Sequence, residues 1–278
     1  MKKIAAVFDG LRFPGSTLHY AVSVAKAVQA HLVGIFLDDL SYHSFSMYQM
    51  LNEGVQNSEI MEFIARDERK RHEAARVFET ACQEAGLTYS THHDHNIALQ
   101  DVLHESIYAD MMIIGMNETF TREVATPPTR FIRDLLTDVQ CPVMLVPPGQ
   151  EDIRKIVLLY DGEPSSVYAI KMFSYLLPPW KELEVEVVSV NEANAGLHLE
   201  NGRLMKEFMK RHFPKATYSV MKGPVEEKII SHLQRQPIHT LVVLGAYRRG
   251  AVSRWFRASM ADMLMHTLSI PLFVAHNK

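Results

Sequence analysis

Two stretches decide the fold: KKIAAVFDG at residues 2–10 and RKIVLLYDG at residues 154–162. Each consists of a basic pair, an apolar run of strand length and a final Asp-Gly. Two further pairs of segments repeat in the same order: ADMMIIGMNE (109–118) with IHTLVVLGAY (238–247), and CPVMLVPP (141–148) with IPLFVAH (270–276). Three landmarks that recur in one order predict two tandem copies of a single unit.

The landmarks also suggest where the copies begin and end. We expect one domain at residues 1–148 and a second at 153–278, joined by PPGQED at 147–152, a composition typical of linkers. The first copy is longer, and the extra residues fall in a Met/Tyr-rich insertion at about 41–59. This insertion is interpreted either as a lid or apolar ligand surface, or as an irregular segment packed over the first domain.

Short apolar runs alternate with longer amphipathic ones within each copy. The first copy predicts strands at 4–8, 31–39, 87–91, 111–115 and 143–146, with helices at 16–29, 59–85, 97–108 and 129–137. Nearly continuous Val, Ile and Leu in the strands indicates a parallel sheet covered by helices on both faces. The predicted fold class is therefore α/β, with two tandem doubly wound, five-stranded parallel sheets.

The composition is that of an ordinary globular protein, with 47% hydrophobic and 22% charged residues among 278. A formal net charge of −3 gives no general attraction to nucleic acid or to an anionic membrane. The two cysteines, Cys82 and Cys141, are interpreted as small core residues rather than a disulfide framework. The first apolar run is too short for a signal peptide, and no run is long enough to span a membrane. We expect a cytoplasmic protein.

Open parallel sheets bind ligands at the carboxyl ends of their strands, where successive connections diverge. Asp9-Gly10 and Asp161-Gly162 follow the first strand of each copy, and Gly115 and Gly245 follow the fourth. For the two aspartates, a turn formed by the side chain and contact with a ligand are both open.

The loop GAYRRGAVSRWFRASMADML at residues 245–264 is the most basic segment near this edge. It contains two glycines, Gly245 and Gly250, and a serine, Ser259, placed to cap the next helix. The same loop carries four arginines: Arg248, Arg249, Arg254 and Arg257. Guanidinium groups beside a helix start favour a phosphate cradle, and a solvated surface loop is the alternative.

These residues resemble the universal stress protein family. Its ATP-binding members carry G-x2-G-x9-G-[S/T] after the fourth strand, then a last helix and a final strand similar to MADMLMHTLSIPLFVAH at 260–276. The four positions of that pattern fall on Gly245, Arg248, Ala258 and Ser259 in the second copy, and on Gly115, Glu118, Pro128 and Thr129 in the first. The inner glycines are replaced in both copies.

The resemblance implies a Rossmann-like fold in each copy and ATP as the candidate cofactor. On the adenine side it pairs Asp9 with Leu32 and Asp161 with Val185. Because Glu118 would repel phosphate and Pro128 lacks an amide donor, the second copy is the expected site. Its residues are Asp161, Gly162, Val185, Leu244, Gly245, Arg248, Gly250, Ala258, Ser259 and Met260. A weaker site in the first copy would use Asp9, Gly10, Leu32, Gly115 and Thr129.

The run THHDHN at 91–96 contains three histidines, His92, His93 and His95, beside Asp94. His93 and His95 would share a face of an extended segment, which can begin a zinc site without completing it. The second copy has no equivalent, so a solvated loop is expected and no metal.

The resemblance favours a stress-response protein that binds a small ligand, with ATP as the leading candidate. A scaffold or binder of apolar ligands is one alternative, and a slow ATPase is another. The sequence lacks the GxxxxGK[ST], GxGxxG and GxSxG motifs, so a conventional enzyme is not expected. Members of the family pair their final strands. The same pairing within this chain would join 143–146 to 272–275 as an internal pseudo-dimer, and a further homodimer is left open.

Overall fold

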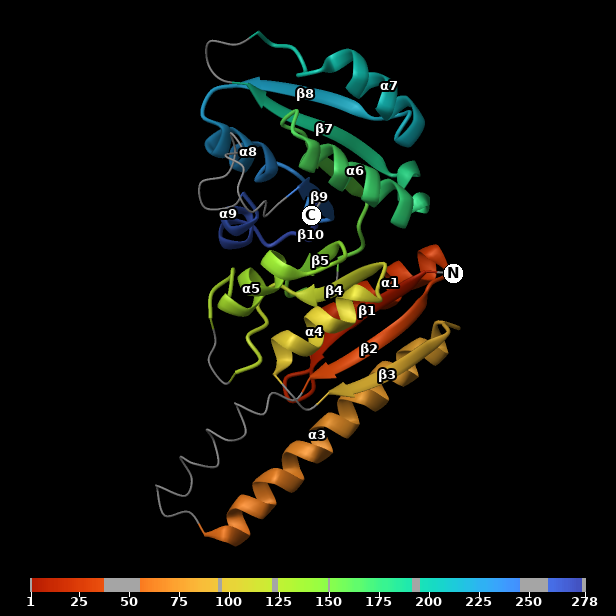
Figure 1. Ribbon diagram of the computed structural model, residues 1–278, viewed down its shortest axis with the longest axis vertical. Coiled ribbons are helices and arrows are strands. Elements are labelled where there is room, and N and C mark those ends of the chain that lie inside the picture. The colour runs from red at the N-terminus through yellow and green to blue at the C-terminus, as the bar shows by residue number, and fades with distance from the viewer. Residues whose placement is uncertain are drawn as a thin grey trace. The chain divides into compact units, whose positions relative to one another are not determined.

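A computed structural model describes residues 2–37, 56–94, 97–121, 125–149, 151–191, 196–245 and 260–276. The chain divides into two compact units, Met1–Cys141 and Pro142–Lys278 (Figure 1). Most of the Met/Tyr-rich insertion and the whole arginine-rich stretch 246–259 lie outside the described residues. The predictions for those two segments therefore rest on the sequence.

The first unit alternates strands with helices along the chain, as its sequence predicts. Its sheet has the order β3-β2-β1-β4 and every described pairing in it is parallel. The elements are β1 (Lys3–Asp9), α1 (Gly15–Val28), β2 (His31–Leu37), α3 (Asn57–Glu84), β3 (Tyr89–Asp94), α4 (Ala98–Ile107), β4 (Met111–Gly115) and α5 (Arg130–Asp138).

The second unit repeats this order in β8-β7-β6-β9 and adds the strands β10 and β5 beside β9. Its strands run β5-β10-β9-β6-β7-β8 across the sheet. The elements are β5 (Val143–Val146), β6 (Lys155–Leu159), α6 (Pro164–Leu176), a 3-10 turn (Pro178–Glu182), β7 (Glu184–Asn191), α7 (Gly202–His212), β8 (Thr217–Lys222), α8 (Val225–Leu233), β9 (Thr240–Gly245), α9 (Met260–Thr267) and β10 (Leu272–Ala275). Each sequence copy thus contributes five strands, which confirms the predicted fold class.

The predicted pairing of the two final strands is confirmed. β5 and β10 run antiparallel, with Phe273 opposite Met144 and Leu272 opposite Leu145. β5 ends the first sequence copy but lies in the second compact unit, because its partner β10 is there. A paired strand no longer offers its edge groups to another chain. The repeat boundaries 1–148 and 153–278 remain a prediction from the sequence.

Burial on both faces explains the near-continuous apolar strands. Every residue of β4, β5, β9 and β10 is buried, as expected for a sheet covered by helices on both sides. In the first unit, the rings of Phe8, Phe36 and Phe78 meet at centroid distances of 5.4–5.9 Å. Gly34 makes room for this cluster, since an added Cβ there would lie 2.9 Å from the Phe78 ring.

The long charged helix predicted before Gly86 is α3. It ends at Glu84, and Gly86 follows with φ +66°. The Gly86 amide donates to the carbonyl of Gln83, and the Leu87 amide donates to that of Cys82 at 2.9 Å. These bonds satisfy carbonyl groups at the end of the helix, which glycine permits through its positive φ.

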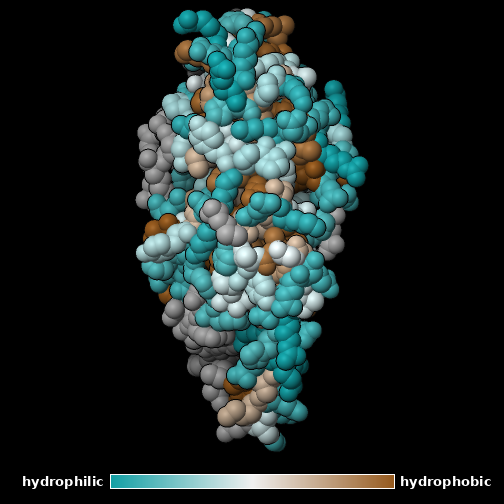
Figure 2. All heavy atoms as spheres, turned by 90° about the vertical axis from the view of Figure 1, so that its right-hand side faces the viewer, coloured by the Kyte–Doolittle hydropathy of each residue, from teal (hydrophilic) through white to brown (hydrophobic). Residues whose placement is uncertain are grey.

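The face of the molecule seen in Figure 2 is predominantly polar. Figure 2 shows hydrophilic residues over most of the visible face, with hydrophobic residues in scattered patches. Across the described ranges, no helix is both long enough and apolar enough to cross a membrane.

The core of the second unit should depend strongly on Phe273. This residue is fully buried in β10 and lies edge-to-face with Phe173 at 5.2 Å. Phe273→Ala should lower the free energy of unfolding by about 3–5 kcal/mol, because it removes a large buried side chain and leaves a cavity. Urea unfolding followed by tryptophan fluorescence measures this, since Trp180 lies 6.1 Å from Phe173.

Tyr175→Ala on α6 provides the matched control. Tyr175 is 56% exposed, so its loss should change the same transition by much less. Equal losses in the two variants would contradict the assignment of Phe273 to the core.

Candidate functional site

In the first unit, Asp9 and Gly115 lie at the carboxyl ends of two neighbouring strands. β1 lies between β2 and β4, and Val7 pairs with Ile114. Gly115 is therefore level with Phe8, and Asp9 lies one residue beyond. The connections from β1 and β4 leave toward opposite faces at this point, which is where parallel sheets form ligand crevices.

The second unit has the same arrangement around β6. Leu158 pairs with Val243, so Gly245 is level with Tyr160 and Asp161 follows directly. The structure thus brings together Asp161, Gly162 and Gly245, as the sequence predicts. Two other predicted residues, Leu244 and Met260, are buried to 2% and 1% exposure, so they belong to the core near this edge.

Both aspartates form side-chain turns. Asp9 Oδ1 accepts hydrogen bonds from the amides of Leu11 at 2.8 Å and Arg12 at 3.3 Å. Asp161 Oδ1 accepts one from the amide of Glu163 at 3.0 Å. These bonds shape the loop after the first strand in each unit. Ligand contact by the two carboxylates remains a prediction.

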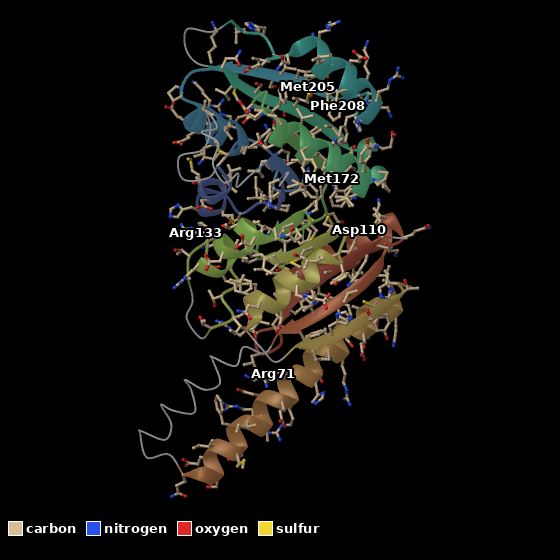
Figure 3. All side chains as sticks on the ribbon, in the orientation of Figure 1. Arg71, Asp110, Arg133, Met172, Met205 and Phe208 are labelled. Atoms are coloured by element: carbon tan, nitrogen blue, oxygen red, sulfur yellow. The ribbon has the colours of Figure 1, made fainter. Side chains whose placement is uncertain are left out.

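Arg12 links the two loops that border the crevice of the first unit. Its Nε lies 3.5 Å from Asp9 Oδ2, and its Nη2 donates to the carbonyl of Thr121. Arg71 reaches the same crevice from α3, with its Cγ 3.0 Å from the point where a Cβ on Gly10 would lie (Figure 3). Neither arginine was identified from the sequence, because only the packing of α3 and the loops brings them there.

Gly245 is required by close backbone packing. A Cβ at this position would lie 2.5 Å from the Ser165 carbonyl carbon and 2.8 Å from the Ser166 amide nitrogen. Both atoms belong to the first turn of α6. Glycine therefore lets the amino end of α6 reach the end of β9, where the positive end of the helix dipole favours anions.

An acidic group lies beside Gly162. This glycine has φ +84°, and an added Cβ would lie 2.9 Å from the Glu200 carboxyl carbon. The Tyr160 hydroxyl donates to the Glu200 carbonyl at 2.9 Å. Burial raises the pKa of Tyr160, and the charges of Glu200 and Asp161 add to the effect. No sequence pattern marked Glu200, which lies in the turn before α7.

Two predicted adenine-side residues are placed at the wrong end of the sheet. Leu32 pairs with Ile4, near the start of β1, and Val185 pairs with Ile156. Both prediction errors have one cause, because the resemblance implies an aliphatic residue in the second strand, and β2 and β7 each contain several buried ones. The residue level with Asp9 is Leu37, the last residue of β2.

Thr129 caps α5 in the first unit. Its Oγ1 accepts a hydrogen bond from the Ile132 amide at 3.2 Å and donates to the Glu118 carbonyl at 2.5 Å. The cap joins the start of α5 to the turn after β4. Ser259 is the residue of the second unit that corresponds to Thr129. It lies outside the described residues, as do the other predicted site residues Arg248, Gly250 and Ala258.

The histidine run has separate local roles. His92 Nδ1 lies 2.6 Å from Glu105 Oε1, while the ring of His93 stacks on Phe36 at 5.3 Å. His95 lies outside the described residues. Within the described ranges, no three His, Cys, Asp or Glu side chains are grouped to hold a metal.

The two cysteines are free and buried. Burial raises the pKa of the Cys82 thiol to about 11 and that of Cys141 to about 12, so neither is activated as a thiolate.

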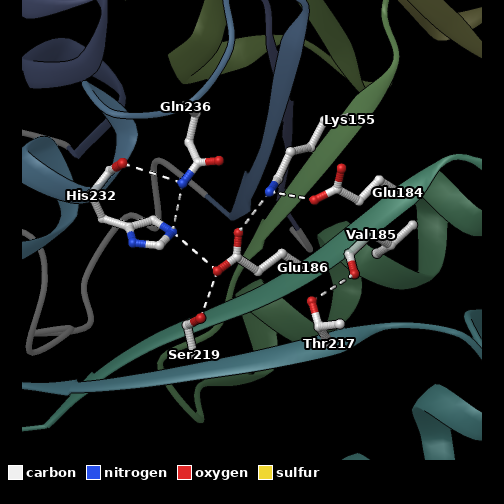
Figure 4. A network of polar contacts seen from close by, with 8 residues as sticks. All are labelled: Lys155, Glu184, Val185, Glu186, Thr217, Ser219, His232 and Gln236. Atoms are coloured by element: carbon white, nitrogen blue, oxygen red, sulfur yellow. Dashed lines mark hydrogen bonds and ion pairs between the residues drawn. The ribbon is translucent and has the colours of Figure 1, made fainter.

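A second polar cluster, not identified from the sequence, lies around Glu186 in β7 (Figure 4). Its Oε1 accepts a hydrogen bond from Ser219 at 2.5 Å and lies 3.1 Å from His232 Nε2. Its Oε2 lies 3.3 Å from Lys155 Nζ, which also contacts Glu184 at 2.6 Å. Burial opposes the ionisation of Glu186, but Ser219, His232 and Lys155 outweigh it and lower its pKa.

The first unit has a corresponding cluster with its carboxylate on another element. Lys3 begins β1 as Lys155 begins β6, and its Nζ lies 3.2 Å from Glu105 of α4. Glu105 also binds His92 of β3. Burial again opposes ionisation, and the bonds from His92 and Lys3 lower the Glu105 pKa. Each unit therefore joins a helix to its sheet through a Lys, a Glu and a His.

Comparisons with solved structures support the fold predicted from the resemblance. A universal stress protein from Archaeoglobus fulgidus aligns with 99% of this chain and 98% of its own, with TM-score 0.72 and 13% identity. A putative universal stress protein from Pseudomonas aeruginosa aligns with 99% of this chain and 92% of its own, with TM-score 0.61 and 14% identity. A functionally unknown protein from the same organism gives TM-score 0.60. No family model and no curated protein matches the sequence.

The chain thus has the fold of a tandem universal stress protein, and the predicted resemblance is confirmed at the level of the fold. These relatives align along the whole chain and not one half of it.

Gly245→Ala should destabilise the second unit. The new methyl group would force β9 and the first turn of α6 apart, and overpacking of this kind costs about 1–3 kcal/mol. Gly202→Ala is the matched control, since a Cβ at this helical position has its nearest neighbour at 3.6 Å. Urea unfolding should show a lower midpoint for the first variant only. Equal midpoints for Gly245→Ala and the parent protein would contradict the close contact.

Glu186→Gln should reduce stability at neutral pH and flatten its acid dependence. Because the folded pKa of Glu186 is lowered, its contribution is fully present above the ordinary value of 4.5 and is lost as the pH falls below it. The loss at pH 7 should be about 1–3 kcal/mol, since a buried charge pair loses one partner.

Glu182→Gln is the control for this variant. Glu182 pairs with Lys215 at 2.6 Å, and both side chains are 74% exposed. Surface pairs contribute little, so its unfolding curve at pH 7 should match that of the parent protein. Parallel pH profiles for Glu186→Gln and the parent protein between pH 3 and 7 would count against the assigned role.

Proposed function

We propose that this protein is a cytoplasmic, stress-response ligand-binding protein whose second unit binds ATP. The observation that carries the proposal is the arrangement at the carboxyl ends of β6 and β9, the position of the predicted ligand crevice. There Asp161, Gly162 and Gly245 come together beside the amino end of α6. Crevices at this point of a doubly wound sheet are the usual ligand sites of the architecture.

The charges around this crevice fit the two ends of a nucleotide. Asp161 and Glu200 place carboxylates around Gly162, and Tyr160 adds a hydroxyl. Carboxylates accept hydrogen bonds from ribose hydroxyls but repel phosphate. We therefore assign the ribose to this side of the crevice. The phosphates would lie toward the loop that carries Arg248, whose guanidinium suits them.

In this proposal ATP is a ligand whose occupancy follows its cellular concentration. The residues of the chain would bind it without catalysing a reaction. A slow ATPase is an alternative that keeps the same site. A scaffold with no nucleotide is the other alternative. The carboxylate near Gly162 favours the scaffold, because it narrows the space for an anionic ligand.

Calorimetric titration of the nucleotide-stripped protein with ATP tests the proposal. We expect about one ATP per chain, and Arg248→Glu should abolish the binding heat because a carboxylate would face the phosphates. Arg235→Glu is the matched control, since Arg235 follows α8 outside the crevice. It should leave the binding isotherm unchanged.

Absence of heat and of any ATP-induced thermal shift in the parent protein would reject nucleotide binding. A phosphate-release assay on the same samples separates a sensor from an ATPase. Steady release of more than one phosphate per chain would favour the enzyme.

A further inference from the structure

The crevice of the first unit contains a carboxyl group supplied by the chain itself. Glu118 follows β4 in a tight turn, in which its amide donates to the Gly115 carbonyl at 3.2 Å. Its side chain folds back over the glycine. Oε1 and Cγ lie 3.2 and 3.3 Å from the point where a Cβ on Gly115 would be.

Contacts on the backbone hold this turn in place. The Glu118 carbonyl accepts a hydrogen bond from Thr129 Oγ1 at 2.5 Å, and Thr129 also caps α5. The turn is therefore attached to the amino end of α5. The Glu118 side chain is directed into the crevice by the same geometry that caps this helix.

Thr17 of α1 points a hydroxyl at the same space. Its Oγ1 lies 3.4 Å from the Cβ point of Gly115, on the side of the first turn of α1. Thr17 is fully buried, and its hydroxyl has no hydrogen-bond partner among the described residues. A buried polar group without a partner is costly, so this position is built for a polar neighbour.

The surroundings of Glu118 do not favour its charge. Burial raises its pKa to about 8, the charge of Asp9 adds to this effect, and Arg12 opposes it. The Glu118 carboxyl group lies near the amino end of a helix, a position where proteins commonly bind anions. It also excludes phosphate, by bulk when neutral and by charge when ionised.

The two sequence copies differ in charge at this position. Glu118 stands where the second copy has Arg248, three residues after the corresponding glycine. The repeat thus offers a natural comparison between a carboxylate and a guanidinium at equivalent sequence positions.

We propose that Glu118 is the specificity-determining residue that closes the first unit to phosphate and confines nucleotide binding to the second. The inference rests on the proposed function for the identity of the ligand. It goes further by assigning the difference between the two units to one side chain. Removal of the Glu118 side chain should open a second anion site lined by Thr17, Gly115 and the start of α1.

Calorimetric titration with ATP of two full-length variants, Glu118→Gly and Glu118→Arg, tests this proposal. The glycine variant removes the occupant, and the arginine variant copies the second unit. Binding should rise from about one to about two ATP per chain in at least one of them. Asn117→Gly is the control, because it loosens the same exposed turn while keeping the carboxyl group, and it should bind as the parent protein does.

Combining each variant with Arg248→Glu locates the new site. The double variant should retain about one ATP per chain, now in the first unit. If the single variants have the melting temperature of the parent protein and still bind one ATP, or if the double variant binds none, the proposal is wrong.

The outcomes separate this inference from the proposed function. A parent protein that binds no ATP, with a Glu118 variant that binds one, would reject the second-unit site and support the role of Glu118. No binding by any of the proteins would reject both.

Discussion

Burial of the first strand of each copy between two parallel neighbours constrains the rest of the structure. β1 and β6 each have a strand on both sides and helices on both faces. A strand in that position must be apolar throughout, and polar residues can follow only where it ends. This is why Asp9 and Asp161 come directly after the apolar runs and form the turns that lead to the next helix. Those turns and the ends of β4 and β9 meet at the position where doubly wound sheets form ligand crevices.

The two units keep this framework and differ in the groups that fill it. Gly115 has a glutamate and a threonine hydroxyl above it, whereas Gly245 has the backbone of α6. The acidic group of the second crevice, Glu200, lies instead beside Gly162. One unit therefore presents a carboxyl group between β1 and β4, and the other presents it next to the loop after β6. The equivalent strand ends of the two units therefore differ in where their carboxyl groups lie.

The clusters around Glu186 and Glu105 likewise use similar side chains from different elements in the two units. A lysine at the start of the first strand is retained in both units. The carboxylate comes from a strand in the second unit and from a helix in the first, and the histidine changes element in the opposite sense. What persists is one carboxylate in contact with a lysine and a histidine, and not the position of each residue. Paired charges are tolerated in this setting because each carboxylate has several partners.

The sequence by itself determined the repeat, the order of strands and helices, the end of α3 at Gly86 and the pairing of β5 with β10. The first three features follow from apolar periodicity and helix-ending residues, which are local signals in the sequence. The strand pairing follows from the family resemblance. The sequence did not determine which residue of β2 or β7 lies level with the aspartate after the first strand, and Leu32 and Val185 were therefore misplaced. Only the tertiary structure decided that Glu200, Arg12 and Arg71 lie at these strand ends, and that the Glu118 side chain folds back over Gly115. Their positions depend on how loops and a distant helix pack against the sheet, and such packing has no periodic trace in the sequence.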